Sequence, residues 1–453
     1  MKVGFISLGC SKNLVDTEKT IAMFKENGYE IVNAPEVADI IVVNTCGFIQ
    51  SAKEEAINTI LEMAEYKNAC CKCLIIMGCL VERYKEELEK EIPEVDLWIK
   101  YSKYATLWEQ IEEVIKQITS REEKLAIPQE ALLRKENGMV YDFNEFQERV
   151  ITTGSDYAYL KIADGCSNRC TYCAIPYIRG PQISRKMEEI IEEAKKLADK
   201  GYKEIILIAQ DTTKYGTDIY GKARLPELLT KLSEIPNIEW IRFLYAYPET
   251  IDDELIQVVK ENKKVCHYFD IPIQHIANPV LKRMNRKSNG DSIRKLIKKL
   301  RDEIPDVVIR TTVMVGFPGE TKEDFEELYA FMQEAKFDKL GCFSYSKEEG
   351  TPAEKLKDQI HPMTKKSRYH KIMSLQRQVS KENMKKHLGK KLQVLVEGKT
   401  FDNKYYTGRS YMDVPEIDGI VYIKAKEGKI LQEGDFIDCT VVEIDDYDLI
   451  CES

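Results

Sequence analysis

The stretch that most constrains this chain is Gly165-Cys166-Ser167-Asn168-Arg169-Cys170-Thr171-Tyr172-Cys173. Three soft thiolates at this C-x3-C-x2-C spacing can converge on one metal centre without help from the rest of the fold. A cubane iron–sulfur cluster held by three thiolates keeps one iron open for a small molecule, whereas a structural zinc site needs a fourth ligand. The next cysteine is Cys266 and the nearest downstream histidine is His267, so no zinc partner follows the motif. The spacing therefore favours a 4Fe–4S cluster over a zinc knot or buried thiols.

The residues before this motif predict where it lies in the fold. Residues 157–163 are rich in alternating aromatic and apolar side chains, which predicts a strand. The cysteines then follow the carboxyl end of that strand, where parallel α/β folds place their ligands.

Residues 152–346 repeat strand and helix, which predicts an open or partial (β/α)6 barrel. The predicted strands lie near 157–163, 204–209, 240–245, 268–273, 307–315 and 339–345, and the predicted helices near 186–200, 225–235, 252–262, 292–303 and 322–335.

Polar residues and glycines follow several of these strands. They are Gln210-Asp211, Gln274-His275 and the loop Gly316-Phe-Pro-Gly-Glu-Thr321. The loop lacks the Gly-Lys-Ser/Thr of a phosphate-binding P-loop, and Thr321 with Asp324 forms a plausible capping box, so part of it is a helix start. Its glycines still allow close approach of the backbone to a cofactor. His275 is either a structural histidine or a pocket residue, and the sequence leaves both open.

Residues 1–118 also alternate strands with amphipathic helices, which predicts a parallel sheet with helices packed on it. Cys10, Cys46 and Cys79 each follow a predicted strand, and such positions share one edge of a parallel sheet. We therefore expect a second three-thiolate cluster there, the alternative being three buried cysteines. Cys70, Cys71 and Cys73 precede a strand, should lie at the opposite edge, and are interpreted as incidental.

The remaining segments complete the domain order. Residues 119–151 are polar and weakly periodic, which predicts a linker, and residues 347–389 predict a helical connection. Residues 390–453 carry short strands and turns, which predict a small antiparallel β-barrel of the OB-like type. This last segment contains eight Lys or Arg and fourteen Asp or Glu, a net charge of −6, which suits a basic protein partner better than nucleic acid.

The whole-chain composition sets further limits. Thirteen cysteines without an export signal favour metal or redox chemistry in the cytoplasm over disulfides. No stretch has the length of apolar sequence that a membrane span needs. The net charge of −9 argues against a general phosphate-backbone binder.

This order resembles the radical S-adenosylmethionine (SAM) methylthiotransferases, which have an N-terminal three-cysteine domain, a radical SAM core and a C-terminal TRAM barrel. The motif is similar to the C-x3-C-x-aromatic-C signature of the superfamily, with Tyr172 in the aromatic position. The resemblance implies SAM as cofactor and two 4Fe–4S clusters. Cys166, Cys170 and Cys173 would bind the SAM-cleaving cluster, and Cys10, Cys46 and Cys79 an auxiliary cluster that carries the sulfur. From their positions, we expect a SAM or substrate pocket to include Tyr172, Gln210, Asp211, His275 and Gly316.

Several motifs resemble the RimO type within this family. They are Ser7-Leu-Gly-Cys-Ser-Lys-Asn-Leu-Val-Asp-Thr-Glu18, Ala209-Gln-Asp-Thr-Thr213, Ile273-Gln-His275 and Asp413-Val-Pro-Glu-Ile-Asp-Gly419. The resemblance implies methylthiolation of an aspartate β-carbon in ribosomal protein S-twelve, free or in the small ribosomal subunit. An electron donor and a sulfur source would be further partners, with no membrane partner and direct nucleic-acid binding unexpected.

Three other interpretations remain open at this point. A tRNA adenosine methylthiotransferase of the MiaB type would share the chemistry but should bind tRNA in a salt-dependent manner. A non-catalytic iron–sulfur redox protein would explain the cysteines but not the polar residues at the strand ends. A zinc-stabilised RNA-binding module would contain zinc and no iron.

Overall fold

The computed structural model describes residues 1–123, 149–154, 156–426 and 428–453. The chain divides into two compact units. The first comprises Met1–Thr152, Gly165–Ser167 and Cys173–Pro181, and the second comprises Thr153–Asp164, Asn168–Tyr172 and Gln182–Ser453.

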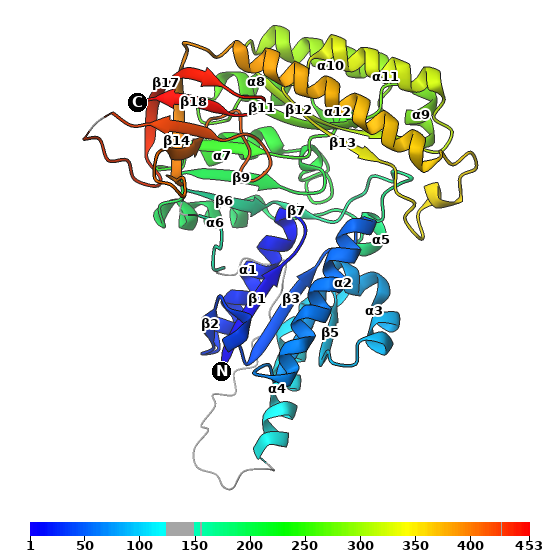
Figure 1. The fold of residues 1–453 in the computed structure, drawn as a ribbon, viewed down its shortest axis with the longest axis vertical. Helices are drawn as coiled ribbons and strands as arrows, with labels where there is room; N and C mark the ends of the chain where they lie inside the picture. The colour runs from blue at the N-terminus through cyan, green and yellow to red at the C-terminus, as the bar shows by residue number, and fades with distance from the viewer. Residues whose placement is uncertain (124–148, 155, 427) are drawn as a thin grey trace. The chain divides into compact units, whose positions relative to one another are not determined.

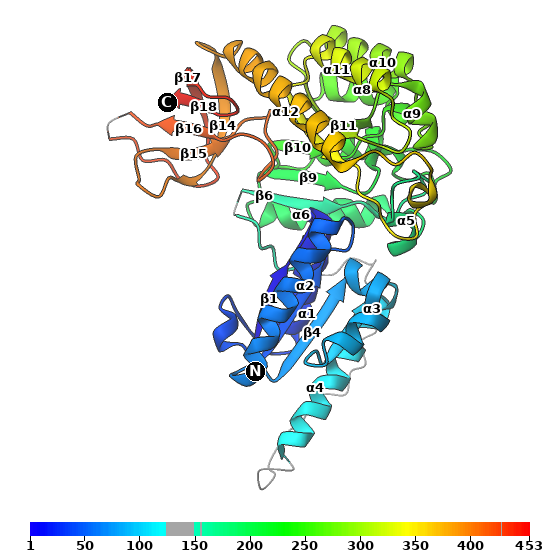
Figure 2. The same cartoon turned by 45° about the vertical axis from the view of Figure 1, so that its right-hand side comes forward.

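The first unit is a parallel sheet between two layers of helices, as expected from its alternating pattern (Figures 1 and 2). The strands, in the spatial order β2-β1-β3-β4-β5, are β2 (Glu30–Val32), β1 (Lys2–Ser7), β3 (Ile40–Thr45), β4 (Cys73–Gly78) and β5 (Leu97–Lys100). The helices are α1 (Ser11–Glu26), α2 (Gln50–Glu65), α3 (Cys79–Glu91) and α4 (Leu107–Glu123). Side chains of α1 and α4 pack on one face of the sheet and those of α2 and α3 on the other.

Helix α4 shows why the expected linker began too early. Leu107, Trp108, Ile111 and Ile115 recur at helical spacing and are buried against the sheet, so the helix packs as a fourth covering element. It continues to Glu123, beyond the expected boundary at residue 118. Residues 124–148 of the expected linker lie outside the described residues.

The second unit contains the six predicted parallel strands in chain order. They are β6 (Tyr157–Lys161), β9 (Glu204–Ile208), β10 (Trp240–Phe243), β11 (Tyr268–Gln274), β12 (Val308–Val315) and β13 (Lys339–Ser344). They form two three-stranded sheets, β10-β9-β6 and β11-β12-β13, and among the described residues a single bridge between Ile241 and Val265 connects β10 toward β11. The predicted partial barrel is therefore open and divided into two halves.

The helices of this core are α6 (Met187–Asp199), α7 (Leu225–Ser233), α8 (Asp253–Glu261), α10 (Gly290–Glu303) and α11 (Lys322–Ala335). The predicted capping box at α11 is present, because Thr321 Oγ1 accepts from Asp324 N (3.1 Å) and Asp324 Oδ2 accepts from Thr321 N (2.9 Å). Four short elements were not predicted: β7 (Ala163–Asp164), α5 (Ile175–Ile178), β8 (Ile183–Ser184) and α9 (Asn278–Arg283).

Helix α12 (Pro362–Lys385) leads into the closed C-terminal barrel (Figure 2). Its strands, in the order β14-β15-β16-β18-β17, are β14 (Lys391–Lys399), β15 (Tyr406–Arg409), β16 (Val421–Lys424), β18 (Leu449–Glu452) and β17 (Phe436–Ile444). The barrel is antiparallel as expected except at one pair, because β16 and β18 are parallel. The hairpin from β17 returns β18 in the same direction as β16, and this pairing closes the barrel.

Buried ion pairs fasten this barrel to the core of the same unit. They are Glu204 with Arg409 (2.8 Å), Lys339 with Asp413 (2.7 Å), and Arg310 with Asp418 (3.7 Å). Asp413 and Asp418 therefore neutralise buried cations and add nothing to the acidic surface of the barrel, although the sequence counted them there. None of the described helices combines the length and the apolar composition that crossing a membrane requires.

Candidate iron–sulfur sites and the strand-end pocket

The structure brings Cys10, Cys46 and Cys79 to one edge of the first unit's sheet. Cys10 follows β1, Cys46 follows β3 and Cys79 begins α3 directly after β4, and these three strands are adjacent and parallel. A Cβ added to Gly9 would lie 2.7 Å from Cys46 Cβ, so the Cys10 loop contacts Cys46 directly. The expected convergence of the three thiols is thus present, while their role as ligands stays a prediction.

Asn13, at the start of α1, holds these strand ends together. Its Nδ2 donates to Leu8 O (3.0 Å) and to Thr45 O (3.1 Å). Its Oδ1 lies 3.8 Å from Cys79 Sγ. One buried amide therefore fixes the loops after β1 and β3 beside the third cysteine.

Arg179 completes this site from a distant part of the sequence. Its Nη2 donates to Asn13 Oδ1 (2.6 Å) and Asp16 Oδ2 (3.1 Å), and its guanidinium lies over the Tyr101 ring at 4.5 Å. Arg179 ends the short helix α5, which begins two residues after Cys173. Residues from this helix pack on the third thiol, since Cys79, Ala174 and Ile178 form one buried apolar cluster.

The electrostatic environment differs among the three thiols. Burial raises the pKa of Cys10, but Lys12, Arg179 and backbone N–H groups outweigh it and leave the pKa below its ordinary value. Burial raises the pKa of Cys46 to about 11, and the neighbouring Cys79 and Cys10 thiolates add to that rise. Burial likewise raises the pKa of Cys79, against the opposing charge of Arg179. The pKa of Cys46 is raised by both other thiolates and that of Cys79 by the Cys10 thiolate, so the three side chains lie close enough to interact electrostatically.

The donor set fits an iron–sulfur cluster better than a single ion. Within the described ranges, no three or more His, Cys, Asp or Glu side chains are placed to hold one metal ion. A cubane cluster makes a different demand, because its thiolates bind separate irons. Three soft thiol donors beside a cation, in an apolar setting, match the chemistry of such a cluster.

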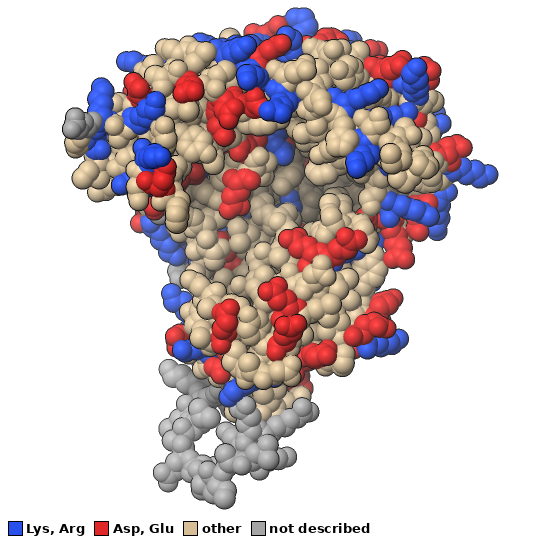
Figure 3. Space-filling model, in the orientation of Figure 1, with Lys and Arg blue, Asp and Glu red and all other residues tan. Residues whose placement is uncertain are grey.

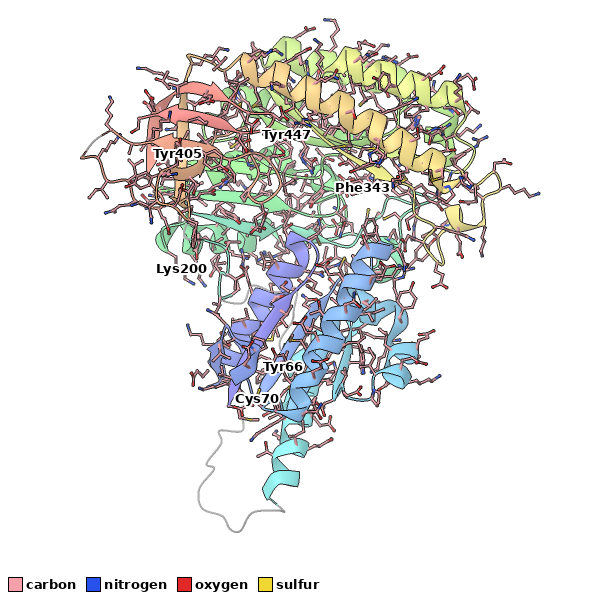
Figure 4. The ribbon with its side chains drawn as sticks, in the orientation of Figure 1. Tyr66, Cys70, Lys200, Phe343, Tyr405 and Tyr447 are labelled. Atoms are coloured by element: carbon pink, nitrogen blue, oxygen red, sulfur yellow. The ribbon has the colours of Figure 1, made fainter. Side chains whose placement is uncertain are left out.

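Cys70, Cys71 and Cys73 lie where the sequence placed them, at the amino-terminal edge of the sheet. Figure 4 shows Cys70 near Tyr66 at that end of the first unit. Cys70 Sγ lies 3.5 Å from Pro35 O and Cys71 Sγ 3.3 Å from Cys73 O. They take no part in the edge that carries Cys10, Cys46 and Cys79.

Cys170 belongs to the second unit, whereas Cys166 and Cys173 belong to the first, where Cys166 N donates to Gly180 O (3.0 Å). Within the second unit, Cys170 Sγ lies 3.6 Å from Tyr247 Oη, and the Arg286 guanidinium covers the Tyr247 ring at 4.2 Å.

Asp211, one of the predicted pocket residues, holds the same motif. The buried Asp211 carboxylate accepts from Asn168 Nδ2 (2.8 Å) and Thr213 Oγ1 (2.6 Å), and Lys214 Nζ lies 3.8 Å away. Burial raises the pKa of Asp211 despite these partners. Gln210, beside it at the end of β9, is half-buried. Asp211 is thus connected to the motif through Asn168, which the sequence did not single out.

His275 is fully buried and neutral. Its Nδ1 accepts from Ala277 N (3.0 Å), and burial lowers its pKa to about 3. Its Nε2 has no hydrogen-bond partner among the described residues. The histidine is therefore half satisfied, and its role in a pocket stays a prediction.

The glycine loop after β12 is held by a carboxylate that the sequence did not identify. Glu320 Oε2 accepts from the backbone N–H groups of Gly316 and Phe317, and Arg368 of α12 lies 3.0 Å from its Oε1. Gly316 has φ +72°, and a Cβ there would lie 2.4 Å from Lys365 Cγ, so only glycine fits. Tyr172 packs with its ring 6.4 Å from Phe317 in the adjoining apolar cluster.

Two non-glycine residues at neighbouring strand ends have left-handed backbone conformations. Tyr245 follows β10 with φ 62°, and Gln274 ends β11 with φ 66°. Asp270 Oδ2 accepts from Tyr245 N (3.0 Å), which helps to maintain the strained conformation. Nothing in the local sequence distinguishes these residues, and the Asp270 side chain that holds Tyr245 comes from another strand.

Three family descriptions match the chain. Residues 160–332 match the Radical SAM superfamily, residues 2–100 match the Uncharacterized protein family UPF0004, and residues 388–453 match the TRAM domain.

Proteins named "Ribosomal protein uS12 methylthiotransferase RimO" resemble the chain over its full length. The one from Alkaliphilus oremlandii is 59% identical over 452 residues, covering 100% of this chain and 99% of the relative. The one from Acetivibrio thermocellus is 51% identical over 451 residues, covering 100% and 98%. The one from Clostridioides difficile is 47% identical over 451 residues, covering 99% and 98%.

A solved structure shares the fold at low sequence identity. The radical S-adenosylmethionine methyltransferase TsrM from Kitasatospora setae, with cobalamin and a 4Fe–4S cluster bound, is 13% identical with a TM-score of 0.53. The match covers 78% of this chain and 76% of that one. At this identity the likeness concerns the fold alone.

Proposed function

We propose a function from one premise: this chain belongs to the radical SAM family named ribosomal protein uS12 methylthiotransferase RimO. It is a radical SAM transferase, and the family implies SAM and a 4Fe–4S cluster. We propose that it inserts a methylthio group at the β-carbon of an aspartate in uS12, the small-subunit protein S-twelve. The convergence of Cys10, Cys46 and Cys79 at one sheet edge carries this proposal, because sulfur insertion needs a second cluster that SAM cleavage alone does not.

The proposal assigns each cysteine set to one cluster. Cys166, Cys170 and Cys173 hold the cluster that binds SAM, and Cys10, Cys46 and Cys79 hold the auxiliary cluster. When bound, the first cluster supplies the electron that cleaves SAM and the second presents the sulfur to be transferred.

The chain's own residues orient and shield these sites. Arg179 places a positive charge beside the auxiliary thiols and anchors Asn13, which in turn fixes the loops after β1 and β3. Ala174 and Ile178 cover Cys79 and exclude water from it. The Asp211–Asn168 hydrogen bond orients the SAM motif, and Glu320 shapes the Gly316 loop. We assign the SAM or substrate pocket to Tyr172, Gln210, Asp211, His275 and Gly316.

The proposal also names partners and boundaries. We propose that the enzyme acts in the cytoplasm. Its partners would be uS12, either free or in the small subunit, together with an electron donor and a sulfur source. We propose an N-terminal domain that extends to the end of α4 at Glu123, a core at 152–346 and a barrel at 390–453, joined by 124–151 and 347–389. The exposed carboxylates of the barrel would attract basic uS12, without Asp413 and Asp418, which are buried in ion pairs.

Iron analysis of the anaerobically reconstituted protein tests the two-cluster assignment. We expect about eight irons per chain in the wild type and about four in a Cys10→Ala/Cys46→Ala/Cys79→Ala variant. A Cys70→Ala/Cys71→Ala/Cys73→Ala variant is the matched control and should keep about eight. If the first variant kept the wild-type iron content, the auxiliary-cluster assignment would be wrong.

A further inference from the structure

Helix α12 and the residues that follow it carry a strong local excess of positive charge. Residues 362–391 contain ten Lys or Arg and a single acidic residue, Glu382, a net charge of +9 within a chain whose net charge is −9. The acidic net charge of the whole chain therefore hides a basic segment. Whether this segment forms a positive surface depends on which of its Lys and Arg side chains are exposed.

One face of α12 collects these charges on the outside of the protein. Its exposed side chains include the basic strip, defined as Lys366, His370, Lys371, Arg377, Lys381 and Lys385. At 100° per residue these positions span about 140° of the helix, and no Asp or Glu of α12 lies within that arc. In Figure 3, blue side chains recur along the course that α12 takes in Figure 1, with red ones beside them.

The opposite face of α12 is already occupied. Ile372, Leu375 and Val379 are buried, and Gln376 Nε2 donates to Phe337 O (3.0 Å) before β13. The helix therefore offers no free apolar face for insertion into a membrane surface. The strip itself contains no large apolar side chain, which the centre of a protein–protein interface would need.

Few carboxylates neutralise the strip. Lys366, Lys371 and Lys385 form no ion pair with another described residue, while Arg377 and Lys381 share one carboxylate, Asp446 of the barrel. The neighbouring helix α11 exposes Glu323 and Glu326, so the strip is bordered by negative charge. A line of cations along one helix, with exposed carboxylates of α11 beside it, matches one strand of phosphates better than a broad anionic surface.

We propose that the basic strip of α12 binds the phosphate backbone of RNA. Helix α12 has 24 residues, which at 1.5 Å per residue is about 36 Å and spans several successive phosphates. The RNA is that of the small ribosomal subunit around uS12, and this choice of RNA rests on the proposed function. The inference departs from the expectation, based on net charge, that the chain avoids nucleic acid.

Binding of a fluorescent 20-base-pair RNA duplex tests the strip directly. We expect the triple variant Lys366→Glu/Lys371→Glu/Lys385→Glu to bind the duplex at least tenfold more weakly. The slope of the logarithm of the association constant against the logarithm of the salt concentration should become less steep by about two to three. The matched control, Lys195→Glu/Lys200→Glu/Lys222→Glu, makes the same charge change at exposed lysines away from α12 (Lys200 is labelled in Figure 4) and should keep most of the affinity. Circular dichroism and iron content verify that both variants are folded.

Three outcomes would overturn the proposal. They are no RNA binding by the wild type at 50 mM salt, equal losses in the two variants, or polyglutamate competing as well as RNA at equal charge, which would point to an acidic protein instead. Methylthiolation separates this inference from the proposed function. The strip variant should modify isolated uS12 normally and the assembled small subunit several-fold more slowly. If neither the wild type nor any variant modifies uS12, isolated or in the small subunit, the proposed function is wrong. The duplex measurement still tests RNA binding in that case.

Discussion

Glu320 illustrates how one buried carboxylate can make the stability of this protein depend on pH. Burial raises its pKa to about 7, with Arg368 and two backbone N–H groups opposing that rise. An unfolded glutamate titrates near 4.3, so between about pH 4.5 and 7 the folded state binds more protons than the unfolded state. The free energy of unfolding contributed by Glu320 therefore falls as the pH rises through this window.

Glu320→Gln removes this titration while keeping an oxygen for the Gly316 and Phe317 N–H groups. Urea unfolding of both proteins from pH 5 to 8 should show the stability of the wild type falling, relative to the variant, by up to about 3 kcal/mol. A difference that stays flat with pH would mean that Glu320 has the same pKa in the folded and unfolded states.

Single residues also show what the sequence could and could not predict about the site. The six candidate cysteines were chosen from their spacing and their positions after strands. The structure brings Cys10, Cys46 and Cys79 to one sheet edge, and their role as ligands stays a prediction. Arg179 was not singled out, because it is one of many arginines and its partners Asn13 and Asp16 lie more than 160 positions away. Glu320 was not singled out either, because it belongs to the loop 316–321, whose sequence also predicts the start of a helix. Residues that act through tertiary contacts leave no local pattern.

At the scale of elements, the turn between β4 and α3 depends on Gly78. Its φ is +107°, and a Cβ there would lie 2.4 Å from Thr45 O. Gly78→Ala should therefore destabilise the protein and disturb the position of Cys79. Gly201→Ala is the matched control, since Gly201 has φ +99° but nothing within 4 Å of an added Cβ.

Chemical unfolding should show a loss of about 1 kcal/mol for Gly201→Ala, from backbone strain alone. The loss for Gly78→Ala should be at least about 2 kcal/mol larger, because the backbone of β3 must move to relieve the clash. Equal losses for the two variants would show that the turn has room for a side chain.

The elements that the sequence predicted well are those with a strong amphipathic period. Helix α11 agrees with its prediction at both ends, because its capping box marks the start. The parallel pairing of β16 with β18 was not predictable, because it follows from closing the barrel and from no feature of either strand. The last turn of α4, after residue 118, was assigned to the predicted linker because its sequence is polar and lacks the apolar positions of the earlier turns.

At the scale of the whole molecule, buried ion pairs decide how the C-terminal barrel is held on the core of its unit. Asp413 pairs with Lys339 at 2.7 Å, and both side chains are at most 7% exposed. Asp413→Asn would leave the lysine charge buried without its partner, which costs about 3–5 kcal/mol. Asp438→Asn, at an exposed position of β17, should change stability by less than about 0.5 kcal/mol.

Urea unfolding of both variants measures this contrast. Replacing the pair together, as Lys339→Met/Asp413→Leu, should recover most of the lost stability, because no unpaired charge remains buried. If Asp413→Asn were as harmless as Asp438→Asn, the segment 413–418 would not fasten the barrel, and its carboxylates would be available to attract uS12.

The intact mass of uS12, after incubation with the anaerobically reconstituted enzyme, SAM, a reductant and sulfide, tests the central claim most directly. We predict a gain of one methylthio group in place of hydrogen, located on an aspartate by fragmentation and absent with Cys79→Ala. The Cys71→Ala variant should retain the modification. An unchanged mass of uS12 while 5′-deoxyadenosine still forms would contradict the proposed substrate, and full modification by Cys79→Ala would contradict the auxiliary cluster.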